Sequence, residues 1–243
     1  GGSCFYGCTS LTSITIPNSV TTLGGSCFYG CTSLTSITIP NTINSLGDDC
    51  FNHCTSLTSI TIPNSVTSLG GSCFLKCTSL TSITIPNSVT TLGGSCFSYC
   101  TSLTSITIPN SVTTLGSNNC FRGCTSLTSI TIPNSVTFLG GYSFGGCTSL
   151  TSITIPNSVT KIFNGCFTGC KSLTSINCLA VSAPATYGDT FGDSSSTYTG
   201  SASTGTKYLY MPSNATGYEG TTGDGWAVLL NSTKCNFKIS KTL

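Results

Sequence analysis

The chain has 243 residues, of which only 6% are charged, and its formal net charge is +2. So small a charge gives no electrostatic reason to expect a nucleic-acid partner or an anionic membrane surface. The apolar runs are short and interrupted by Ser, Thr and Pro, so we expect no membrane-spanning segment.

A short repeat, with a period of about 23 residues, fills most of the chain. Its segment Leu-Thr-Ser-Ile recurs at a constant step, which is lengthened only once, where a residue is inserted between Gly116 and Asn119. The copies begin at Leu11, Leu34, Leu57, Leu80, Leu103, Leu127, Leu150 and Leu173. A short fixed period predicts a solenoid, because one such unit cannot bury its own apolar side and must stack on the next.

Within the first repeat, the predicted elements follow one another in a short circuit. The Cys-Phe-x-x-Cys stretch at 4–8 is expected to form one helical or 3₁₀ turn, since positions i and i+4 share a face. Residues 13–16 alternate polar and apolar, which predicts a strand, and Pro17 ends it because it lacks an amide hydrogen. Residues 18–19 turn the chain, and Gly24-Gly25 makes a second corner. We predict a right-handed coil with these side chains and their copies pointing inward: Leu11, Ile14, Ile16 and Val20.

The spacing Leu11-x-x-Ile14-x-Ile16, together with Pro17-Asn18 and the Cys-Phe-x-x-Cys stretch, resembles the BspA-like leucine-rich repeats. The resemblance covers about residues 1 to 178. It implies a β-rich solenoid, a leucine-rich-repeat right-handed coil of about eight 23-residue turns. It also implies a bacterial or protist surface or secreted protein engaged in adhesion and protein binding, with no catalytic residues and no cofactor. One departure is the first Cys of each turn, where the family more often has Ala.

The repeat pattern decays after Ile176. We expect residues 1–178 to form the solenoid and residues 179–243 to form a C-terminal capping segment, because an open solenoid end exposes apolar core and a strand edge. Trp226, Leu229 and Leu230 are expected on or near the final coil. The alternative is a separate ligand-binding domain, which would be small for independent stability.

The N-terminus starts inside a repeat, without an initiator Met or an apolar signal segment. We therefore interpret the chain as a portion of a longer polypeptide. Nothing in this chain precedes the first coil, so we expect its edge to allow edge-to-edge self-association.

Seven cysteine pairs have the spacing Cys-x3-Cys, and a disulfide framework is one interpretation of them. A zinc site is less consistent, because fingers ordinarily use Cys-x2-Cys and His occurs only once. In the seventh turn, however, Ser143 replaces the first Cys and leaves Cys147 without a partner. We therefore interpret the cysteines as unbridged thiols that fill the interior of the coils.

Ionisable side chains are scarce. Residues 1 to 160 contain only Asp48, Asp49, His53, Lys76 and Arg122. The first three share one divergent corner, where a weak cation site is conceivable, but we interpret the corner as solvated. No nucleophile has a recognisable base, and no glycine-rich phosphate loop occurs. We expect neither an enzyme nor a metal or cofactor site.

Two surfaces are candidates for binding. On the strand face we expect two outward rows of hydroxyl residues to bind a ligand, although solubility and β propensity explain them equally well. These residues are Ser59, Thr61, Ser82, Thr84, Ser105, Thr107, Ser129 and Thr131. The second surface is the residue pair after each Phe, where the copies differ, and we interpret this variation as drift on a tolerant loop.

These observations and the resemblance lead to one functional hypothesis and two alternatives. The hypothesis is a non-catalytic adhesion or protein-interaction module at the cell surface or secreted, with extracellular or host proteins as partners. The first alternative is a carbohydrate-binding surface, for which the scattered Tyr6, Tyr29 and Tyr99 are weak candidates. The second is a surface that binds ice or another regular solid, which requires a flat face.

Overall fold

The computed structural model describes residues 1–187, 190–191, 207–218 and 237–240. Within these residues there are strands, turns and bends but no helix. The strands are β1 (Ser45–Leu46), β2 (Ser68–Leu69), β3 (Ser82–Thr84), β4 (Thr91–Leu92), β5 (Ser105–Thr107), β6 (Thr114–Leu115), β7 (Phe138–Leu139), β8 (Ser152–Ile155), β9 (Lys161–Ile162), β10 (Ser175–Cys178), β11 (Ala185–Thr186), β12 (Lys207–Tyr210) and β13 (Phe237–Ser240).

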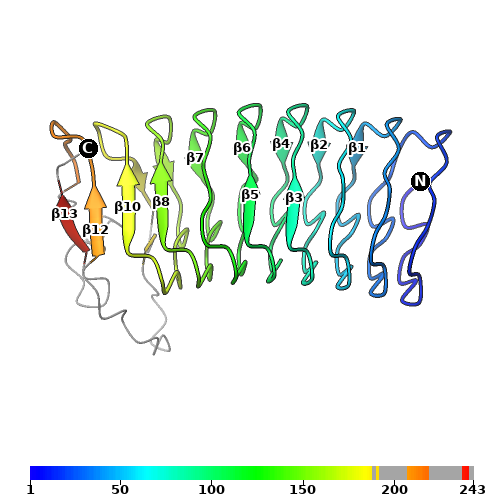
Figure 1. The fold of residues 1–243 in the computed structure, drawn as a ribbon. Helices are drawn as coiled ribbons and strands as arrows, with labels where there is room; N and C mark the ends of the chain where they lie inside the picture. The colour runs from blue at the N-terminus through cyan, green and yellow to red at the C-terminus, as the bar shows by residue number, and fades with distance from the viewer. Residues whose placement is uncertain (188–189, 192–206, 219–236, 241–243) are drawn as a thin grey trace.

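The coils stack side by side in a single row, as Figure 1 shows. The longer strands β3, β5, β8, β10, β12 and β13 lie in a first line, and the shorter strands β1, β2, β4, β6, β7, β9 and β11 lie in a second line. All strand pairs in the described residues are parallel, and single bridges such as Thr15 to Thr38 and Thr107 to Thr131 join the coils between the longer strands. The predicted parallel solenoid is therefore confirmed.

The interior consists of identical side chains from successive coils. Leu34, Ile37, Ile39 and Ile43, the copies of the four positions expected to point inward, are all buried. In the first coil the same positions are only partly buried, because no coil covers their other side. This confirms the predicted alternation, in which Ile faces the core and Ser or Thr faces outward.

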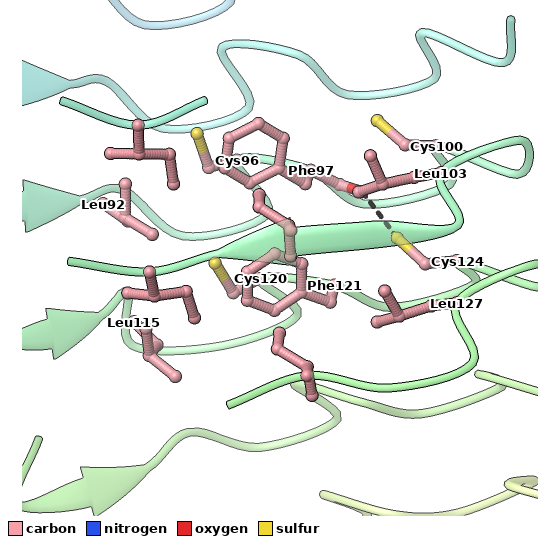
Figure 2. Close-up of a cluster of buried hydrophobic side chains, with 14 of the residues drawn as sticks. Leu92, Cys96, Phe97, Cys100, Leu103, Leu115, Cys120, Phe121, Cys124 and Leu127 are labelled. Carbon is pink, nitrogen blue, oxygen red and sulfur yellow. Dashed lines mark hydrogen bonds between the residues drawn. The ribbon is translucent and has the colours of Figure 1, made fainter. Parts of the chain in front are cut away.

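A column of phenylalanines runs through this interior. Successive rings from Phe5 to Phe167 stack with centroids 5.1–5.8 Å apart and with planes within 10° of parallel. Figure 2 shows two of them, Phe97 and Phe121, packed between leucines and cysteines of their own coils. Each ring is therefore hardly tilted relative to the ring of the preceding coil.

The Cys-Phe-x-x-Cys stretch does not form the predicted helical or 3₁₀ turn. It forms consecutive tight turns, in which Tyr6 N donates to Ser3 O and Cys8 N donates to Phe5 O. Ser3 and Gly7 both have positive φ, and so do their copies, which interrupts a right-handed helix after every turn. The amides of Phe5 and Gly7 donate instead to carbonyls of the next coil. Pairing between coils thus replaces pairing within a helix.

The described part of residues 179–243 continues the stack. Strand β12 pairs with β10 and with β13, and Leu209 and Met211 are buried. Tyr218 is also buried, and its hydroxyl donates to Ala180 O at 2.7 Å. Trp226, Leu229 and Leu230, which the sequence places on the final coil, lie outside the described residues.

Candidate functional site

The predicted ligand-binding residues form two regular rows on the first line of strands. All eight side chains are exposed, namely Ser59, Thr61, Ser82, Thr84, Ser105, Thr107, Ser129 and Thr131. The isoleucine between each pair points into the core, as the exposed–buried–exposed pattern of β3 and β5 shows. We call these side chains the strand-face rows.

The register of the sheet places each Ser beside a Ser, and each Thr beside a Thr, of the neighbouring coil. Ser82 pairs with Ser105 and Thr84 with Thr107. The parallel bridges from Thr61 to Thr84 and from Thr107 to Thr131 extend the threonine row over four consecutive coils. With strands about 4.8 Å apart, the four hydroxyls of one row span roughly 15 Å. A partner would meet the same group at equal intervals.

The hydroxyls of the strand-face rows differ from those of the other threonine rows. Thr58, Thr81 and Thr104 each donate a hydrogen bond to the carbonyl of the equivalent residue one coil earlier, at 3.4 Å. Ser88 likewise donates to Val66 O at 2.6 Å. The strand-face rows make no side-chain hydrogen bond to any residue that the structure describes. Their donors and acceptors are therefore available to water or to a ligand.

The cysteines do not form a binding site. All sixteen that lie in the described residues are free thiols, and only Cys4 and Cys8 are exposed. Burial raises the pKa of Cys31 to about 11 and that of Cys147 to about 12. Buried thiols with such high pKa values remain protonated, so they are poor nucleophiles and poor metal ligands.

The second Cys of each pair has a structural role that the sequence did not reveal. The thiol of Cys124 donates to the carbonyl oxygen of Phe97 in the preceding coil, at 3.1 Å (Figure 2). Cys54, Cys77 and Cys100 repeat this contact. These thiols act as hydrogen-bond donors between coils as well as small apolar fillers.

The corner that contains Asp48, Asp49 and His53 is closed by its own hydrogen bonds. Asp48 Oδ1 accepts from Gly71 N at 2.6 Å, and Asp49 Oδ1 accepts from the Asn52 amide at 2.6 Å. The Asn52 Oδ1 in turn lies 2.7 Å from His53 Nδ1. No group of three or more metal-ligating side chains occurs among the described residues. Asp48 thus holds the backbone of the next coil and Asp49 holds the Asn52 side chain, so the two carboxylates are not arranged as a cation cage.

The pKa of His53 is lowered from its ordinary value. Burial is the main cause, the positive charge of Lys76 adds to it, and Asp49 opposes it. The imidazole is therefore neutral at pH 7. It has no nucleophile as a hydrogen-bond partner in the part of the chain that the structure describes.

In the pair of residues after each Phe, which we interpret as a drifting loop, the second residue has a left-handed backbone conformation. Gly7, Gly30, Gly123, Gly146 and Gly169 have φ between 69° and 75°. His53, Lys76 and Tyr99 hold the same position with φ of 57–60° in three consecutive coils.

Of the tyrosines considered for carbohydrate binding, Tyr6 stacks on Tyr29 at 4.7 Å, whereas Tyr99 lies three coils further along.

Comparison with known proteins identifies the family to which the repeat is similar. The family model described as the BspA type leucine rich repeat region matches residues 1–118 and 101–197, in six copies. This count is lower than the eight turns expected from the sequence. No curated protein is similar enough to count as a relative.

Several solved structures share the fold. A leucine-rich repeat protein from T. pallidum is 26% identical, with 73% of each chain covered and a TM-score of 0.52. A leucine rich cell surface protein from Faecalibacterium prausnitzii is 25% identical over 84% of this chain and 65% of its own length, with a TM-score of 0.50. A leucine-rich repeat protein from Bacteroides ovatus, 20% identical over 99% of this chain and 87% of its own, has a TM-score of 0.50 and is similar in fold alone. In the described part of the present chain, no helix has the length and apolarity needed to cross a membrane.

Proposed function

We propose that this chain, which belongs to the BspA-type leucine-rich repeat family, is a non-catalytic module that binds proteins through its strand-face rows. The observation that carries the proposal is the free state of these hydroxyls beside threonine rows whose hydroxyls are bonded to neighbouring coils. An exposed hydroxyl that has no partner within the fold can exchange its bound water for a group of the ligand without breaking a hydrogen bond of the fold.

The setting that we propose is the cell surface or the extracellular space, where the module acts in adhesion. The support is the similar Faecalibacterium protein, which is described as a cell surface protein. The low charge of the chain also fits a surface that recognises its partner by shape and hydrogen bonds, not by long-range attraction.

The test is an array of extracellular matrix and host-surface proteins, probed with the chain and with two double variants. Thr84→Val with Thr107→Val removes two free hydroxyls from the strand-face rows and keeps the side-chain shape. Thr81→Val with Thr104→Val is the matched control, because those exposed threonines bond to the neighbouring coil. We expect the first variant to lose about tenfold in affinity for any protein that the chain binds, and the control to lose little. Equal affinity of both variants, or no bound protein, would contradict the proposal.

A second candidate function is binding to a regular solid such as ice. The observation that favours it is the pairing of like residues in neighbouring coils, Ser82 with Ser105 and Thr84 with Thr107. This register keeps the hydroxyls of each strand-face row in line over four consecutive coils. An ice-recrystallisation assay with the same variants tests it: inhibition that only the Thr84/Thr107 variant loses would support it, and absence of inhibition would exclude it.

A further inference from the structure

A second surface, away from the strand-face rows, combines positive charge with aromatic rings. It contains Lys76, Tyr99, Arg122 and Tyr142, which are exposed and lie on four consecutive coils. Cation and aromatic ring alternate along the stack: Lys76, then Tyr99, then Arg122, then Tyr142. We call this group the cation–tyrosine stripe.

The two tyrosine rings lie against the backbone. A Cβ atom built on Gly123 would come within 2.6 Å of Cδ1 of Tyr99, so the Tyr99 ring covers this glycine of the next coil. The Tyr142 ring covers Gly165 one coil further in the same way. Both glycines have positive φ as well, at 71° and 65°. The rings are thus seated on the surface, and 39% and 37% of the two tyrosines remain exposed.

Arg122 stands between the two rings. Its guanidinium carbon lies 5.9 Å from the centroid of Tyr99 and 5.3 Å from that of Tyr142, both within the range of a cation–π contact. These contacts restrain a side chain that otherwise loses much entropy when a ligand fixes it. No carboxylate pairs with Arg122 among the residues described, and none of its side-chain N–H groups donates to them. The planar fork is therefore held ready for an anion.

The charges near the stripe are unevenly distributed along the stack. The described residues contain only two acidic side chains, Asp48 and Asp49, and both are engaged in the corner of the third coil. Lys76 is close enough to lower the pKa of His53 in that corner, yet it forms no ion pair with a described carboxylate. The coils beyond that of Lys76, residues 93–162, thus contain Arg122 and Lys161 but no acidic side chain, whereas Asp48 and Asp49 lie one coil from Lys76.

We propose that the cation–tyrosine stripe binds an acidic polysaccharide. Lys76 and Arg122 hold its carboxylate or sulfate groups, and Tyr99 and Tyr142 pack against its sugar rings. One coil advances by about 5 Å, roughly the length of one sugar in an extended chain. Lys76 and Arg122, two coils apart, therefore match acidic groups that stand two sugars apart along the polymer. An acidic peptide fits less well, because it has no flat apolar faces for two exposed rings.

The experiment measures binding of the full chain to alginate, heparin, neutral dextran and polyglutamate by calorimetry at low and moderate salt. Alginate supplies carboxylates and heparin mainly sulfates, so these arms identify the anionic group. We expect binding to at least one of them, weaker at higher salt, and none to dextran. Arg122→Gln should reduce the affinity about tenfold, and Arg122→Lys should lose less because it keeps the charge but not the fork.

The aromatic part is tested separately. Tyr99→Phe keeps the ring and should retain affinity, whereas Tyr99→Ala should lose it several-fold while the unfolding temperature stays close to that of the parent. The Thr84/Thr107 variant is the control and should bind the polysaccharide normally, which separates this site from the proposed protein-binding face. Polyglutamate bound as tightly as alginate or heparin, no binding to either polysaccharide, or unchanged affinity after Arg122→Gln would overturn the proposal.

Discussion

Ser143 occupies the position at which the other repeats have the first Cys of the pair, and the two side chains differ by one atom. The neighbouring coils carry a buried Cys at this position, such as Cys120 and Cys166. Ser143 is fully buried as well, and its Oγ has no hydrogen-bond partner. A buried hydroxyl without a partner costs free energy, whereas a thiol in the same place is a small, weakly polar filler.

We therefore predict that Ser143→Cys stabilises the protein. The free energy of unfolding should rise by about 1–2 kcal/mol, because the substitution removes an unsatisfied hydroxyl and fills the column. Chemical denaturation under reducing conditions measures it. Cys120→Ser is the mirror variant and should lower the stability by a similar amount. A Ser143→Cys variant less stable than the parent would show that the serine has a partner in solution.

At the scale of the element, each coil is held to the next by repeated contacts of the same kind. The phenylalanine column supplies apolar contact. The second Cys of a pair donates its thiol hydrogen to the carbonyl oxygen of the Phe in the preceding coil, as Cys124 does to Phe97. At the first Cys of each turn, where the family more often has Ala, a buried sulfur such as that of Cys96 fills a small space in the interior, and burial keeps the thiol protonated.

We predict that the buried thiols are inert in the native protein. Titration with a thiol reagent near pH 8 should modify Cys4 and Cys8 rapidly, since they alone are exposed among the described cysteines. Burial raises the pKa of the buried thiols, to about 11 at Cys31 and about 12 at Cys54, so they should react only after unfolding. In denaturant without reductant, well over half of the 17 cysteines should become reactive. Recovery of only one or two would mean that disulfides staple the array.

At the scale of the whole molecule, stability in stacked repeats is largely a sum of interfaces between neighbours. The ends are therefore the weak places. The first coil leaves Cys4 and Cys8 exposed and Phe5 and Leu11 half-buried. At the other end, β12 and β13 continue the sheet beyond β10, and Tyr218 packs beneath with a hydrogen bond to Ala180. These contacts support our proposal that residues 179–243 are a cap.

We predict that deletion of residues 179–243 causes aggregation and lowers the unfolding temperature, because it opens the edge of β10 to other chains. Light scattering and thermal unfolding measure the two effects. Deletion of residues 58–80, which removes one full repeat, is the control. It keeps both ends and should stay monomeric. If the 1–178 chain remains monomeric and as stable as the parent, residues 179–243 form a separate domain instead.

The sequence by itself determined the coil, because the short fixed period and the alternation of Ser-Ile-Thr-Ile constrain which side chains meet when copies stack. It also indicated free cysteines, through the single replacement at Ser143. It did not determine the turn at residues 4–8, where the pattern fits a helix equally well. There, hydrogen bonds to the next coil favour positive φ at Ser3 and Gly7.

Only the tertiary structure distinguished the hydroxyl rows from one another. Thr81 and Thr84 are the same residue type on the same exposed segment, yet only the Thr81 hydroxyl reaches a carbonyl of the preceding coil. The tertiary structure also brought Tyr142 beside Arg122, although the two residues hold different positions in their repeats. A repeat fixes which residues are equivalent, but contacts between unlike positions depend on the path of the backbone around the corner, which the period does not encode.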